Sequence, residues 1–124
     1  MQERGLEGVA ATCHCGAVEV WLPAPPAEVT QCNCSLCRRI GVLWAYAAIG
    51  SVRLVPDPPP TDTYAWNGRN VDFHRCRSCG CVTHWFPRRR GRDRMGVNAR
   101  LLDPEVLAAA TLRTKDAAGT GRFR

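Results

Sequence analysis

The 124-residue sequence has no long apolar run, no internal repeat and no linker that would divide it. Its longest apolar stretch, 42–49, is far too short for a helix that spans a bilayer. The first residues lack the apolar segment of a secretory signal, so we expect a cytoplasmic protein whose cysteines stay reduced. We also expect a single domain over residues 1–124, with its core at about 8–114.

Helix signals are scarce, whereas short alternating apolar segments are frequent. One C-terminal helix is predicted to about residue 109, with Asp103 as N-cap followed by Pro104. A helical turn is predicted over 35–41. The expected strands are 9–13, 17–22, 29–32, 43–49, 51–55, 61–66, 69–75, 81–86, 94–101 and 111–114. Gly50 and the Asn67-Gly68 pair each predict a hairpin between their neighbouring strands. The pattern indicates a small, mainly β domain stapled by metal.

Cysteine, in contrast, is abundant. The eight cysteines form three tight groups: Cys13 and Cys15; Cys32, Cys34 and Cys37; and Cys76, Cys79 and Cys81. An even number of cysteines also fits a disulfide framework, but Cys-x-Cys pairs close strained loops and no export signal is present. Closely spaced cysteines in a reducing compartment are typical of metal ligands.

The first and last groups predict a closed structural zinc site. Zinc in such sites takes four tetrahedral ligands, usually two pairs from distant turns. The pairs Cys13/Cys15 and Cys76/Cys79 are each followed by a glycine, which allows the backbone to turn beneath a metal. We therefore expect these four thiolates to hold one zinc ion.

The middle group predicts a second zinc with a free coordination position. Cys32, Cys34 and Cys37 supply three ligands, which is the arrangement that catalytic zinc sites use. In the alternative, Cys81 completes a second four-thiolate site. Its position two residues after Cys79 on an expected strand favours a buried free thiol instead. An open three-thiolate zinc would favour a thiol as its fourth ligand and lower the pKa of that thiol.

Three segments carry a family resemblance. They are 13–18 (CHCGAV), 32–41 (CNCSLCRRIG) and 76–80 (CRSCG), and they resemble the glutathione-dependent formaldehyde-activating (GFA) enzyme family, which includes the centromere protein V type. The resemblance covers about residues 8–110. It implies a β-tent fold, two zinc ions per chain, and a reactive zinc on the middle group. It further implies carbon–sulfur lyase chemistry like that of S-(hydroxymethyl)glutathione synthase, with glutathione and formaldehyde as substrates.

Further candidate site residues are two arginines that follow the middle cysteine group, a histidine and several aromatic residues. Arg38 and Arg39 follow it directly, so we expect them to contact a thiol substrate ahead of the basic loop Arg88–Arg94, which also fits a solvated surface. His84 is a candidate for proton transfer beside the reactive zinc. The aromatic residues are expected in the core or in a pocket wall: Trp44, Tyr46, Trp66 and Trp85.

Two functions remain open from the sequence. One is an enzyme acting on a small thiol or aldehyde through an open zinc site. The other is a zinc-stapled binding module that recognises an acidic partner through its arginines. The formal charge is +6, and seven ligating thiolates with two zinc ions lower it to about +3. Such a mildly basic surface does not indicate nucleic acid, and the oligomeric state is left open.

Overall fold

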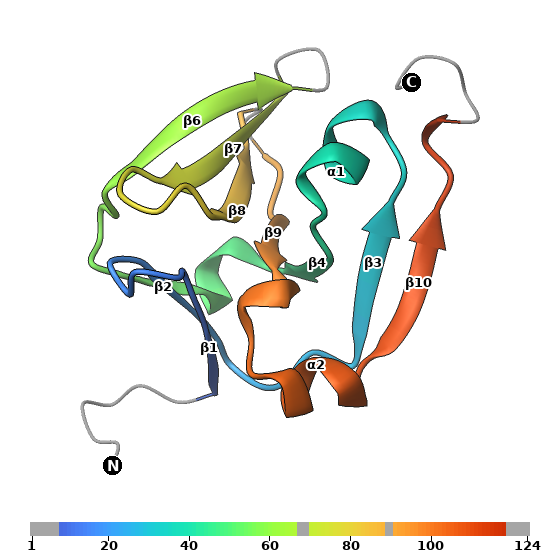
Figure 1. The fold of residues 1–124 in the computed structure, drawn as a ribbon, viewed down its shortest axis with the longest axis horizontal. Helices are drawn as coiled ribbons and strands as arrows, with labels where there is room; N and C mark the ends of the chain where they lie inside the picture. The colour runs from blue at the N-terminus through green and yellow to red at the C-terminus, as the bar shows by residue number, and fades with distance from the viewer. Residues whose placement is uncertain (1–7, 67–69, 89–90, 119–124) are drawn as a thin grey trace.

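The computed structural model describes residues 8–66, 70–88 and 91–118 (Figure 1). The strands are β1 (Val9–Thr12), β2 (Glu19–Leu22), β3 (Glu28–Cys32), β4 (Trp44–Ala47), β5 (Arg53–Val55), β6 (Thr61–Trp66), β7 (Val71–Cys76), β8 (Val82–Pro87), β9 (Met95–Asn98) and β10 (Thr111–Lys115). The helices are α1 (Ser35–Ile40) and α2 (Pro104–Ala109), with short 3-10 turns η1 (Ile49–Ser51) and η2 (Ala99–Leu101). The prediction of a mainly β protein is confirmed.

The strands form two sheets. One has three strands in the order β1-β2-β5, and the other has seven in the order β10-β3-β4-β9-β8-β7-β6. Within these sheets β10 and β3 pair in parallel, which places Lys115 opposite Cys32, whereas the other paired strands are antiparallel. In Figure 1 the turn between β1 and β2 lies close to the turn between β7 and β8, where the two sheets meet.

One of the two hairpin predictions is confirmed, and the other is wrong. Strands β6 and β7 pair antiparallel from Thr61↔Cys76 to Trp66↔Val71, and the Asn67-Gly68 pair lies outside the described residues. The Gly50 segment does not connect two paired strands, because β4 pairs with β3 and β9 while β5 pairs with β2. The 3-10 turn η1 instead carries the chain from the large sheet to the small one.

Both helices are short and have their predicted ends. In α1 the Cys34 thiol caps the first turn by accepting from the Cys37 backbone N–H, and the left-handed Gly41 (φ 70°) ends the helix. A residue without a Cβ is favoured in that conformation. Asp103 precedes α2 and Pro104 begins it, although the Asp103 side chain makes no capping hydrogen bond. No helix among the described residues is long and apolar enough to cross a membrane.

Strand alternation divides the buried residues into two clusters. The first packs the small sheet against the large one, with Val18, Val20, Met95 and Val97 almost fully buried. The second surrounds the middle cysteine group and includes Trp44 and Phe73.

Strands β7 and β8 contribute to both clusters, because neighbouring residues of a strand point to opposite faces. The cross-strand pair Phe73↔Trp85 faces the second cluster. The adjacent pair His74↔His84 stacks at 4.3 Å on the other face, where both rings contact Phe86 of the first cluster.

A glycine in β9 makes room for one of these aromatic side chains. A Cβ on Gly96 would overlap the indole of Trp85, its cross-strand partner. We expect Gly96→Ala to destabilise the fold by roughly 1–3 kcal/mol through overpacking. Denaturant unfolding measures this change. Gly50→Ala is the control, since its Cβ would meet open space, and equal stabilities of the two variants would contradict the prediction.

Candidate metal centre

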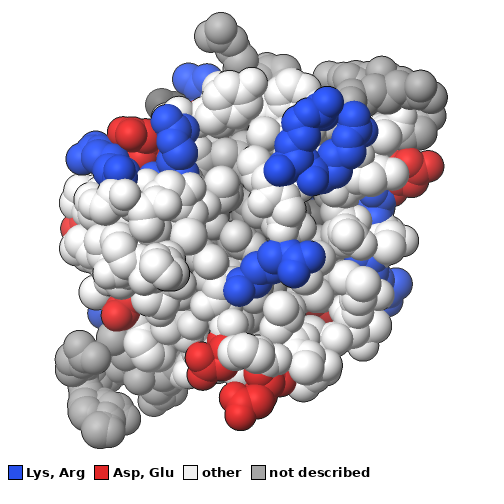
Figure 2. Space-filling model, viewed as in Figure 1, with Lys and Arg blue, Asp and Glu red and all other residues white. Residues whose placement is uncertain are grey.

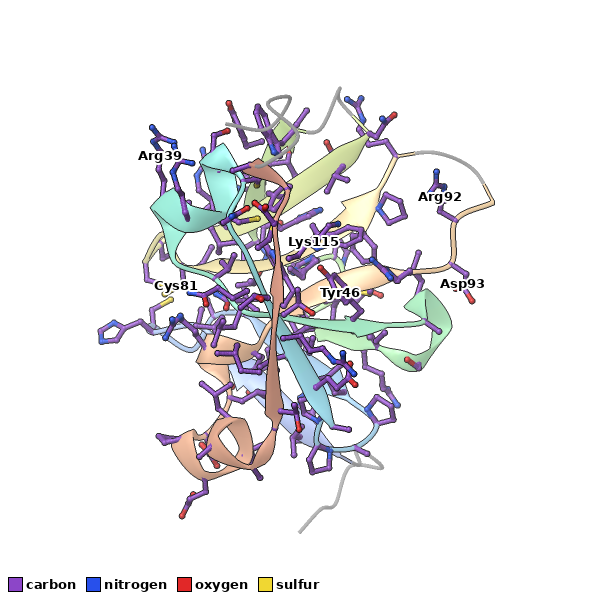
Figure 3. All side chains as sticks on the ribbon, turned by 90° about the vertical axis from the view of Figure 1, so that its right-hand side faces the viewer. Arg39, Tyr46, Cys81, Arg92, Asp93 and Lys115 are labelled. Atoms are coloured by element: carbon purple, nitrogen blue, oxygen red, sulfur yellow. The ribbon has the colours of Figure 1, made fainter. Side chains whose placement is uncertain are left out.

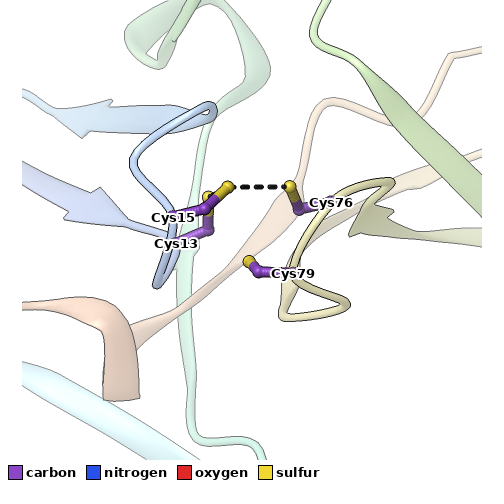
Figure 4. Close-up of side chains that lie close together, drawn as sticks. All are labelled: Cys13, Cys15, Cys76 and Cys79. Carbon is purple, nitrogen blue, oxygen red and sulfur yellow. Dashed lines mark hydrogen bonds between the residues drawn. The ribbon is translucent and has the colours of Figure 1, made fainter.

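Four cysteines meet where the two sheets join. Cys13 and Cys15 come from the β1–β2 turn, and Cys76 and Cys79 come from the end of β7 and the turn that follows (Figure 4). Their sulfur atoms all lie within 4.8 Å of one another. The Sγ of Cys15 is 3.7 Å from that of Cys13 and 3.6 Å from that of Cys76. The structure thus brings together the four residues that the sequence predicted.

The local backbone supports this cluster. Gly16 and Gly80 both have φ of 82°, a conformation that residues with a Cβ rarely adopt. The turns direct N–H groups at sulfur: Val18 N donates to Cys13 Sγ (3.3 Å) and Ser78 N donates to Cys76 Sγ (3.4 Å). Backbone hydrogen bonds, first from Cys81 and then from Cys15, lower the pKa of Cys79 to about 5. The turns therefore supply hydrogen-bond donors to the sulfur atoms of this cluster.

The sulfur spacing fits a zinc ion. Zinc–sulfur bonds of about 2.3 Å in tetrahedral geometry place ligand sulfur atoms roughly 3.8 Å apart. The observed separations of 3.6 and 3.7 Å are close to that value. Four soft thiol donors that can fill all four coordination positions of one ion are typical of a structural zinc site.

The second cluster lies where β3 enters α1. Cys32 ends β3, Cys34 caps α1 and Cys37 lies within it, and all three are buried. Their sulfur atoms also lie within 4.8 Å of one another. Trp44 Nε1 donates to Cys37 Sγ (3.4 Å), and a hydrogen bond from the Cys37 thiol lowers the pKa of Cys32 to about 5 while the same bond raises the pKa of Cys37. One turn of chain thus gathers three thiol donors, which suit a soft metal such as zinc.

Cys81 belongs to neither cluster. It is partly buried against the first hydrophobic cluster, and its carbonyl accepts a hydrogen bond from Cys76 N (2.9 Å). Figure 3 shows Cys81 well apart from Lys115, which pairs with Cys32. The alternative in which Cys81 completes the three-cysteine cluster therefore has no support in the geometry.

The three-cysteine cluster borders a cavity of about 540 Å³. Its walls are mainly aromatic: Trp44, Tyr46, Trp66, Phe73 and Trp85. Edge-to-face contacts hold several of these rings in place, with centroids 5.6 Å apart for Trp44 and Phe73 and 6.2 Å apart for Tyr46 and Trp85. A cavity of this size with apolar walls and few polar groups is typical of a small-molecule site.

Apart from the cysteines, the charged side chains that line this cavity among the described residues are all basic. Arg92 and Arg94 line it from the segment between β8 and β9, and Lys115 lines it from the end of β10. The described lining residues include no aspartate or glutamate. The Arg94 guanidinium lies 4.0 Å above the centre of the Tyr46 ring, so it also fixes one wall. The cavity favours an anionic ligand.

Arg38 and Arg39, the predicted substrate contacts, lie outside this cavity. Arg39 Nη1 donates to the Ser35 carbonyl of its own helix (2.8 Å) and is exposed. Arg38 Nη1 lies 3.5 Å from the Asn33 carbonyl, and Arg38 lines a different, smaller cavity of about 300 Å³ that Cys32, Cys37 and Lys115 also line. Neither arginine lines the cavity with the aromatic walls, where the cations come from segments distant in sequence.

The structure does not bring His84 to the three-cysteine cluster. Its ring is fully buried on the face of β8 opposite to Trp85. Its Nδ1 lies 2.7 Å from Thr83 Oγ1, while its Nε2 has no hydrogen-bond partner among the described residues. Burial, with a contribution from the adjacent His74, lowers the pKa of His84 to about 3, so the ring is neutral.

Comparison with known proteins gives the family. The model of the family described as glutathione-dependent formaldehyde-activating enzyme matches residues 8–115. The chain belongs to this family. It is also similar to a Rhodobacter sphaeroides protein of known crystal structure, with 34% sequence identity and a TM-score of 0.65, covering 83% of this chain and 98% of that one. The GFA match contains all the cysteines of both clusters.

Metal analysis tests the two clusters separately. We expect about two zinc ions per chain, with the three-cysteine site losing its ion first to a chelator because it has fewer protein ligands. Cys34→Ser should lower the content to about one zinc while the fold is retained. Cys81→Ser is the matched control and should keep both. A single tightly held zinc in the unaltered protein would contradict the two-site prediction.

Proposed function

We propose that this protein is a zinc-dependent carbon–sulfur lyase that joins glutathione and formaldehyde reversibly, like an S-(hydroxymethyl)glutathione synthase. The observation that carries the proposal is the three-thiol cluster that lines a cavity with aromatic walls and cationic groups. Membership of the GFA family supports the same activity.

Each cysteine cluster has a separate role in this proposal. Cys13, Cys15, Cys76 and Cys79 would hold the structural zinc. Cys32, Cys34 and Cys37 would hold the reactive zinc, which supplies a Lewis-acid position that favours the ionised form of a bound thiol. The two neighbouring N–H groups, from the Cys37 backbone and the Trp44 indole, donate to sulfur and help to hold the ligating thiolates in place.

The reaction is an addition without redox change. A bond forms between the glutathione sulfur and the formaldehyde carbon, the carbonyl π electrons move to oxygen, and the thiol proton is transferred to that oxygen. The reverse reaction breaks the same carbon–sulfur bond. Rigid aromatic walls limit the water around the adduct and orient its two components, which is the main contribution expected of this chain.

The cavity also suits the peptide part of glutathione. Its volume of about 540 Å³ lies within the usual range for small-ligand sites. Glutathione carries two carboxylates, and the cavity presents cations with no acidic side chain among its described lining residues. We further propose a cytoplasmic location, because free thiols in both clusters require a reducing compartment.

No observation favours the second hypothesis, a binding module for an acidic macromolecule. Basic side chains form separate patches on the face shown in Figure 2. Among the described residues, some basic side chains pair with acidic ones, as Arg77 does with Asp62 (3.1 Å) and Arg113 with Glu28 (2.9 Å). Of the predicted basic loop, residues 89–90 lie outside the described residues.

NMR exchange spectroscopy of glutathione with formaldehyde tests the activity. We expect the zinc-loaded protein to accelerate exchange between free glutathione and its hydroxymethyl adduct. Cys34→Ser should reduce that acceleration at least about tenfold, because a reactive-zinc ligand is lost. Cys81→Ser should leave it unchanged. Exchange no faster than the uncatalysed rate would remove glutathione and formaldehyde as substrates.

A further inference from the structure

The cations of the cavity come from two separate parts of the fold. Lys115 ends β10, the edge strand of the large sheet, and lies in register with Cys32 on β3. Arg92 lies between β8 and β9, on the other side of β4. Figure 3 shows the two residues on different segments of the chain. The three-cysteine cluster and the aromatic walls line the same cavity as both cations.

Hydrogen bonds of Asn33, in the loop between Cys32 and Cys34, hold the backbone around Lys115 in place. Asn33, between the ligands Cys32 and Cys34, donates from its backbone N–H to the Lys115 carbonyl (3.2 Å). Its side chain donates to Asp116 Oδ1 and accepts from Ala118 N, each at 2.9 Å. These bonds join residues more than 80 positions apart in sequence. These bonds fix the backbone from which the Lys115 side chain extends, next to the three thiols.

Arg92 is held by its neighbours in the chain. Asp93 Oδ1 accepts from the Ile49 backbone N–H (3.1 Å), which ties this segment to η1. Arg94 stacks on Tyr46 at 4.0 Å. Among the described residues, no acidic side chain forms an ion pair with Arg92 or Lys115. Both cations are available to a ligand.

We infer that Lys115 and Arg92 are specificity-determining residues that bind the two anionic ends of one thiol ligand, with its sulfur at the three-cysteine cluster between them. The inference rests on the proposed function and extends it to the recognition of the thiol. Both cations line one cavity together with the three-cysteine cluster, and each belongs to a different segment of the chain. Their long side chains can each reach one end of a peptide-sized thiol held in that cavity. A thiol with one carboxylate would engage only one cation.

Calorimetric titration of the zinc-loaded full chain tests the inference without any turnover. The probes are glutathione, its glycine monoethyl ester, and γ-aminobutyryl-cysteinyl-glycine, which lacks the carboxylate at the other end. We expect each single-carboxylate probe to bind about three- to tenfold more weakly than glutathione, as for partly exposed charge pairs.

Two variants then show which cation binds which carboxylate end of glutathione. Lys115→Met and Arg92→Met each keep side-chain bulk and remove the charge. One variant should lose the preference for glutathione over the ester, and the other should lose the preference over the γ-aminobutyryl peptide. Arg113→Met is the matched control, since Arg113 lies two residues before Lys115 on β10 and pairs with Glu28 outside the cavity. It should keep both preferences, and zinc content and circular dichroism check that each variant is folded.

The outcomes separate the inference from the proposed function. Retained preferences in both charge-removal variants, or an equal loss of affinity for all three probes, would overturn two-ended recognition. Acceleration of the glutathione–formaldehyde exchange would then still stand. Conversely, two-ended recognition without any acceleration would support the inference and remove the formaldehyde reaction.

Discussion

Four thiols lie at the junction of the two sheets. The β1–β2 turn of the small sheet and the β7–β8 turn of the large sheet bring their sulfur atoms within 4.8 Å of one another. A chain of this size buries a limited core, so a metal cross-link at this junction would add stability that packing alone supplies poorly. Strands β7 and β8 also place Phe73 and Trp85 in the wall of the cavity that the three-cysteine cluster borders. The structural junction thereby positions a wall of the proposed catalytic site.

The division of the cysteines could be predicted from sequence because it depends on local geometry. Cysteines one or two residues apart in a turn reach one point, and a following glycine such as Gly16 or Gly80 permits the turn. The β6–β7 hairpin and both helix ends follow from equally local signals. The Gly50 hairpin failed because a glycine between two apolar segments marks a change of direction without identifying the sheet that each segment joins.

The cavity could not be predicted because long-range pairing builds it. Lys115 reaches Cys32 through a parallel pairing of β10 with β3, for which neither strand carries a sequence signal. Proximity in sequence favoured Arg38 and Arg39, but neither lines the cavity with the aromatic walls, and Arg38 borders the cysteine cluster from a smaller cavity. For His84 and Trp85, alternation allows only one of two neighbours to face the cavity, and the sequence does not say which.

The parallel pairing of β10 also bears on how the molecule is made. During synthesis from the N-terminus, all eight cysteines leave the ribosome before β10, so both groups of metal ligands can load while the chain is still growing. Lys115 and the partners of the Asn33 side chain arrive last. A nascent chain therefore carries the thiols of the middle group before it holds Lys115, one of the two cations proposed to select the thiol ligand.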